Sequence, residues 1–152
     1  LQLANYIATL VNGGTRHAAH MLKEVKSSDF SQVLYDYQPQ VLGTIEIEDQ
    51  NLNAVKAGML ALTKGSLSSS FGDLPFQVGA KTGSAQTGIQ SDSHAVFVCF
   101  APYDDPEIAV AMAVEHGGSG SELANMAADV LGYYFSSQET REELPTENTL
   151  IR

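Results

Sequence analysis

The chain has 152 residues, enough for one domain or a large part of one. Apolar residues make up 43% and charged residues 17% of it, a balance that permits a packed core and argues against general disorder. The formal net charge of −10 at pH 7 argues against nucleic acid and anionic lipid as partners, because both would repel the chain. No run approaches the ~20 apolar residues of a membrane span, so we expect the chain itself to be soluble.

The first half of the chain is expected to contain two helices and a hairpin. Apolar residues recur at helical spacing over residues 3–11, and two glycines end the pattern. Two short strand-like runs, 21–26 and 32–37, predict a hairpin. A second amphipathic helix is expected to begin at 49–51 and to end near Lys64, followed by a serine-rich loop. Since the sequence opens within a helical pattern and without methionine, we interpret it as a fragment of a longer protein.

The second half is expected to form a sheet and a final helix. Three strand-like runs, 76–85, 94–101 and 108–115, are joined by short segments rich in Gly, Asp and Pro, which predicts an antiparallel meander. The second and third runs are almost wholly apolar, so helices should cover both faces of the sheet. A glycine-rich turn then leads into a helix, where Ser119 and Glu122 have capping-box spacing.

The sequence Lys81-Thr82-Gly83-Ser84 is the strongest candidate for a functional site. Lys81 is the only Lys or Arg in residues 65–140. Ammonium and hydroxyl groups can bind a carboxylate, and an open strand edge can pair with an extended peptide. Strand alternation places Lys81 and Gly83 on one face and Thr82 and Ser84 on the other, and we expect a twist or bulge to bring them to one cleft. The alternative is an ordinary strand with one exposed lysine.

Several segments, in order along the chain, carry a resemblance to a known family; they are residues 1–6, 12–16, 55–59, 79–86, 94–102 and 106–110. The chain resembles the transpeptidase domain of the elongation-type, class B penicillin-binding proteins, for which Lys-Thr-Gly is one signature motif. The resemblance implies an α+β, partial β-lactamase/transpeptidase-like fold, with an incomplete three-stranded antiparallel sheet and flanking helices. We expect this part to occupy residues 1–136 and residues 137–152 to be a polar, disordered tail.

The resemblance also implies a role for each residue of the motif. Lys81 would supply positive potential and help to organise proton transfer, while Thr82 and Ser84 would bind the terminal carboxylate of the substrate. The Ser84 N–H would form half of an oxyanion hole, Gly83 would allow close approach, and Gln86 would line the cleft. The reaction would be serine acyl transfer from the D-Ala-D-Ala end of a peptidoglycan stem peptide, and β-lactams would bind in the same place.

Two further motifs of the family, Ser-x-x-Lys and Ser-x-Asn, do not occur in this sequence. The nucleophile should therefore lie on other sequence, and we expect the chain alone to be inactive. Without its neighbours the run 108–115 would expose an apolar edge, so we expect self-association there. The resemblance places the parent protein at the outer face of the bacterial cell membrane. A carboxypeptidase, a β-lactamase, a β-lactam sensor and a non-catalytic peptide-binding module remain alternatives.

No cofactor and no metal are expected. His17 and His20 supply two rings, whereas zinc takes three or four ligands, and the sequence shows no second cluster. His94 and His116 are interpreted as separate polar residues at strand ends. Cys99 lies in an apolar run and is expected to be a small buried hydrophobe.

Overall fold

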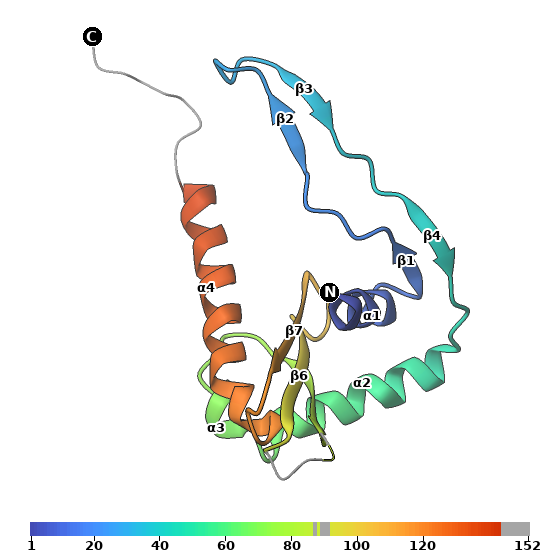
Figure 1. Ribbon diagram of the computed structural model, residues 1–152, viewed down its shortest axis with the longest axis vertical. Coiled ribbons are helices and arrows are strands. Elements are labelled where there is room, and N and C mark those ends of the chain that lie inside the picture. Colours follow the sequence, from blue (N-terminus) through green and yellow to red (C-terminus); the bar gives the residue numbers. More distant parts are fainter. Residues whose placement is uncertain (87, 89–91, 144–152) are drawn as a thin grey trace.

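The computed structural model describes residues 1–86, 88 and 92–143 and shows a body of helices and strands from which a long arm projects (Figure 1). In chain order the elements are α1 (Gln2–Val11), β1 (Thr15–His17), β2 (Glu24–Lys26), β3 (Val33–Asp36), β4 (Val41–Thr44), α2 (Asp49–Lys64), α3 (Ser68–Phe71), β5 (Gly79–Ala85), β6 (His94–Ala101), β7 (Ile108–Val114), the 3-10 helix η1 (Gly120–Leu123) and α4 (Ala124–Glu143). The expected α+β class is confirmed. Among the helices of the described residues, none has both the length and the apolar character of a membrane span.

Strands β5, β6 and β7 form the predicted antiparallel meander, in the order β5-β6-β7. The pairing of β5 with β6 is continuous, from Gly79 opposite Phe100 to Ala85 opposite His94. The first strand begins at Gly79, later than the predicted start at Phe76. Because β6 is the middle strand, β5 and β7 are both edge strands within the described part of the chain.

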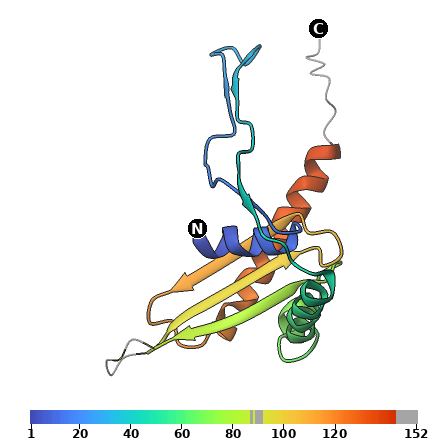
Figure 2. The same cartoon turned by 90° about the vertical axis from the view of Figure 1, so that its right-hand side faces the viewer.

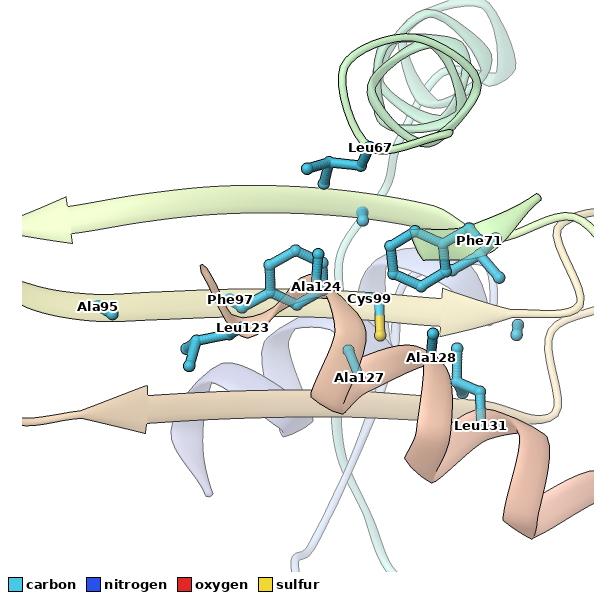
Figure 3. Packing of buried hydrophobic residues seen from close by; sticks show 13 residues of the cluster. Leu67, Phe71, Ala95, Phe97, Cys99, Leu123, Ala124, Ala127, Ala128 and Leu131 are labelled. Atoms are coloured by element: carbon cyan, nitrogen blue, oxygen red, sulfur yellow. The ribbon is translucent and has the colours of Figure 1, made fainter. Parts of the chain in front are cut away.

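The middle strand β6 is buried on both faces because helices cover the sheet on both sides. Phe97 and Cys99 pack with Leu131 of α4 in one cluster, and α4 crosses this face in Figure 3. Val98 and Phe100 belong to a second cluster that includes residues of α1 and α2. The alternation of a strand separates the two sets. The prediction of helices on both faces is thus confirmed.

Two helices differ from the sequence-based expectation. The serine-rich segment expected to be a loop contains the short helix α3, because Phe71 at its end is buried and stacks 6.2 Å from the ring of Phe97. Helix α4 continues to Glu143, past the predicted boundary at residue 136. Leu131 and Phe135 pack the preceding turns against the body, and Pro145 is the first helix-breaking residue after them. Residues 144–152 of the expected tail lie outside the described residues.

The predicted capping box at the start of the last helical segment does not form as such. Ser119 caps η1, but its Oγ accepts a hydrogen bond from the backbone N–H of Ser121 at 3.3 Å. The Glu122 N–H donates instead to the backbone carbonyl of Ser119 at 3.0 Å. The tight 3-10 turn explains the difference, since it brings nearer residues into reach of the capping oxygen.

The arm leaves the body between α1 and α2 (Figures 1 and 2). It consists of two short antiparallel ladders, β2–β3 and β1–β4. The β2–β3 ladder confirms the predicted hairpin, whereas the β1–β4 ladder was not predicted. Each ladder has one irregularity in its register. Strands β2, β3 and β4 are exposed and β1 is only partly buried, so the arm contributes little to either core.

Candidate functional site

The candidate motif lies on β5, at the edge of the sheet (Figure 2). In the register with β6, Lys81 is opposite Val98 and Thr82 is opposite Phe97. Val98 and Phe97 belong to the clusters on opposite faces of the sheet, so Lys81 and Thr82 also lie on opposite faces. The pairing over residues 79–85 has no register shift. The expected alternation is therefore confirmed, and no bulge interrupts β5, since every residue of the strand has a partner in β6. That a twist brings these residues to one cleft stays a prediction.

Lys81 lies on the face of the sheet that α1 and α2 cover. It borders a mainly apolar cavity of about 390 Å³, lined by these two helices and by Val98. Its side chain is exposed, and its Nζ donates a hydrogen bond to the carbonyl of Thr82 at 2.7 Å. In the described residues the one ion pair joins Lys26 to Glu24 on the arm at 3.1 Å. The Lys81 charge thus has no carboxylate partner there and is available to an anion.

Ser84 lies on the opposite face and contacts the turn before η1. Its Oγ accepts a hydrogen bond from the backbone N–H of Gly120 at 3.4 Å. Thr82 is half-buried, and its hydroxyl has no hydrogen-bond partner among the described residues. The two hydroxyls are spaced two residues apart on one face, next to the open edge of β5. This edge is where an extended ligand can pair with the backbone.

Gln86 directly follows β5 and is exposed. The residues after it, 87 and 89–91, lie outside the described part of the chain. The prediction that Gln86 lines the cleft therefore stays a prediction.

Both ends of β5 are hydrogen-bonded to other elements, which positions the motif. At the start, the buried Thr63 of α2 donates a hydrogen bond from Oγ1 to the Val78 carbonyl at 2.6 Å. At the end lies the Gly120 contact with Ser84. Sequence reasoning missed both ties. The run of glycines before η1 was the available signal for the second, but it was interpreted as an ordinary capped turn.

Two of the four histidines are closer together than the sequence indicated. His94 and His116 were interpreted as separate strand-end residues, but their rings lie 5.1 Å apart in an edge-on arrangement. The backbone N–H of His116 donates a hydrogen bond to the ring atom Nδ1 of His94 at 3.0 Å. This contact holds the turn after β7 against the start of β6. His20 stacks on Tyr37 with ring centroids 3.6 Å apart, away from this pair. Among the described residues no group of three or more His, Cys, Asp or Glu is arranged to hold a metal ion.

Cys99 is fully buried in β6, as expected from its apolar neighbours. Burial raises the pKa of its thiol to about 12, because the low-polarity surroundings disfavour the thiolate. A thiol that stays protonated at neutral pH is a poor nucleophile. Cys99 is therefore not a candidate nucleophile.

Together these features define a class of site, in which an ammonium group and two hydroxyls border the open edge of an antiparallel sheet. The family model described as the penicillin binding protein transpeptidase domain matches residues 1–132. The chain belongs to the penicillin-binding protein transpeptidase family, and the resemblance noted in the sequence is confirmed.

Individual relatives agree with this assignment. Penicillin-binding protein 2A of Bacillus subtilis (strain 168) is 26% identical over 166 residues, which cover 97% of this chain and 23% of that protein. The peptidoglycan D,D-transpeptidase MrdA of Escherichia coli (strain K12) is 26% identical over 168 residues, covering 99% and 26%. A solved imipenem acyl-enzyme complex of penicillin-binding protein A from Mycobacterium tuberculosis is 25% identical, with a TM-score of 0.67, and covers 84% of this chain and 29% of that one. The chain spans about a quarter of the length of the curated relatives it matches.

Proposed function

We propose that this chain forms one wall of the active-site cleft of a bacterial D,D-transpeptidase that cross-links peptidoglycan stem peptides. The observation that carries the proposal is that the Lys81 ammonium and the Thr82 and Ser84 hydroxyls border one open edge strand from its two faces, and that this ammonium has no carboxylate partner among the described residues. The relatives support the reaction class, since MrdA is named as a peptidoglycan D,D-transpeptidase and the mycobacterial relative was solved as an imipenem acyl-enzyme.

In this proposal the residues of β5 bind and orient an acyl donor that ends in a carboxylate. The Thr82 and Ser84 hydroxyls donate hydrogen bonds to the carboxylate of D-Ala-D-Ala, or to that of a β-lactam. The Ser84 N–H points at the oxygen that becomes negative when a serine attacks the scissile carbonyl. Gly83 leaves room for the substrate backbone, and Lys81 stabilises negative charge and helps to guide the proton of the attacking serine.

The serine nucleophile belongs to other sequence in this proposal, because Ser-x-x-Lys does not occur in the chain. The cavity beside Lys81 suggests where that segment packs. It is mainly apolar, lies between α1 and α2, and has the ammonium at its border. An amphipathic helix seated there would bring a side chain near Lys81 while burying its own apolar face. The parent protein would act at the outer face of the cell membrane, where peptidoglycan is assembled.

The proposal is tested by covalent labelling. The full-length protein that carries this chain should gain the mass of one β-lactam after incubation with benzylpenicillin, whereas the isolated 152-residue chain should gain none. In the full-length protein, Lys81→Met should slow acylation by about a hundredfold or more, the scale of one group that stabilises transition-state charge. The matched control is Lys26→Met on the arm, which should leave the rate unchanged. Acylation of Lys81→Met at the wild-type rate, or labelling of the isolated chain, would contradict the proposal.

The isolated chain should also self-associate through β7. Strand β7 is almost wholly apolar, and its outer edge has no strand partner in the described part of the chain. Such an edge pairs readily with a second chain. Light scattering should show an average mass that rises with concentration, and a constant monomer mass would refute this part of the proposal.

A further inference from the structure

The turn over residues 116–120 leads from β7 into the first residue of η1 and is attached to β5, which carries the candidate site, and to its neighbour β6. The Gly118 N–H donates to the Ser93 carbonyl at 2.9 Å, and the His116 N–H donates to His94 Nδ1 at 3.0 Å. These two contacts hold the turn against the start of β6. The third contact, from the Gly120 N–H to Ser84 Oγ, reaches β5 itself. The turn therefore fastens two neighbouring strands at the end where the motif lies.

Gly120 makes an unusually close approach to the backbone of the motif. A Cβ atom added to it would lie 2.8 Å from the Gly83 nitrogen and would overlap the carbonyl oxygens of Gly83 and Val96. Real Cβ atoms essentially never come within 3.0 Å of another heavy atom in this way. The contact thus requires glycine at position 120, because the atoms in the way are backbone and cannot turn aside.

The contact also determines what the Ser84 hydroxyl can do. A hydroxyl has one hydrogen to donate and two lone pairs with which to accept. Since the Gly120 N–H occupies one lone pair of Ser84 Oγ, the hydroxyl hydrogen is free to turn toward a ligand. A donor on the oxygen also polarises the O–H bond and strengthens its own donation. This arrangement suits a hydroxyl that binds a carboxylate.

We propose that Gly120 is a positioning residue that holds the Ser84 hydroxyl as a donor to the substrate carboxylate. The inference rests on the proposed function, and it adds a residue outside the motif that determines recognition of the carboxylate. Gly120 acts through its backbone N–H and through the absence of a side chain. It does not touch the substrate.

The test compares acylation of the full-length protein by benzylpenicillin and by its methyl ester, which lacks the carboxylate charge. Gly120→Ala should lower the acylation rate constant for the free acid about tenfold, the scale of one hydrogen bond to a charged group, and leave that for the ester within about twofold. Gly117→Ala is the matched control in the same turn. The atoms nearest to its Cβ would be side-chain atoms of Ala95 and Val114 at 3.0 Å, so it should lower the melting temperature without changing the acid-to-ester ratio. Equal loss with both compounds for Gly120→Ala, or no loss, would overturn the inference.

A second measurement leaves Gly120 in place, in case its substitution prevents folding. In the full-length protein, hydrogen exchange at the Gly120 amide should become faster in Ser84→Ala, because that variant removes the acceptor, and should not change in Thr82→Ala. An unchanged exchange rate at the Gly120 amide in Ser84→Ala would overturn the inference, whether or not Gly120→Ala folds. If the wild-type protein forms no acyl-enzyme with either compound while the Ser84→Ala exchange result still holds, the proposed function fails and the Gly120–Ser84 contact stands as a structural feature alone.

Discussion

The hydrogen bond from Thr63 to the Val78 carbonyl should contribute measurably to stability and to the placement of β5. Thr63 is only 5% exposed, and its Oγ1 lies 2.6 Å from the Val78 oxygen and 3.0 Å from that of Leu60. Thr63→Val keeps the shape of the side chain but removes the donor and leaves buried carbonyl oxygen unsatisfied. This should cost about 1–3 kcal/mol in the free energy of unfolding. Thr63→Ser keeps the donor and loses one methyl group, which should cost about 0.8 kcal/mol.

Urea unfolding of the transpeptidase domain that contains this chain, followed by circular dichroism, measures both free energies. Hydrogen exchange of a peptide that spans the start of β5 provides a local readout, and exchange there should be faster in Thr63→Val than in Thr63→Ser. The reasoning is refuted if Thr63→Val unfolds within about 0.5 kcal/mol of the wild type, the usual spread of neutral substitutions. It is also refuted if Thr63→Ser proves the more damaging of the two, since the methyl group would then matter more than the hydrogen bond.

Two predictions concern the core behind the site. In a urea titration, Phe97→Ala should lower the free energy of unfolding by about 3–5 kcal/mol, because the ring is fully buried and stacks on Phe71. The control Tyr133→Ala should lower it by less than about 0.5 kcal/mol, because Tyr133 is 77% exposed. Cys99 should resist iodoacetamide at pH 8 until the protein is unfolded, as followed by intact mass. Folding raises the pKa of this thiol from 9.0 to about 12. The stability that the neutral thiol contributes is therefore fully present below pH 9 and is lost as the pH rises toward 12. Cys99→Ala should remove this part of the destabilisation at alkaline pH.

The sheet and its two covered faces could be predicted because their signal is local. β6 and β7 are continuous apolar runs between short turns, which predicts strands buried on both faces. This is right for β6, whereas β7 is only half-buried to exposed because it lies at the edge of the sheet. Helix α2 likewise carries its own apolar period and begins at Asp49 as expected. The placement of Lys81 and Thr82 on opposite faces followed from strand alternation alone.

The features that sequence reasoning missed all depend on partners distant in the chain. β1 and β4 are three and four residues long, and the rest of the arm lies between them in the sequence. Strands this short show no alternation of apolar and polar residues from which they could be predicted. α3 consists of three serines and a phenylalanine, a poor helix by propensity, and it is fixed by the burial of Phe71. The role of Gly120 could not be read either, because a sequence shows that a side chain is absent but not which backbone atoms come close.

β5 is held in position by its pairing with β6 along one side and by a hydrogen bond at each end. Its polar residues cannot build a core of their own, and β6 supplies the rigidity because its two faces belong to two separate clusters. Thr63 holds the start of β5 from α2, far along the strand from Ser84, while Gly120 holds the end at Ser84 itself. Loosening the start should therefore lower stability while preserving the preference for a carboxylate ligand. Loosening the end should lower that preference at a smaller cost in stability, because the Ser84 contact is exposed to solvent on one side and the Thr63 contact is not.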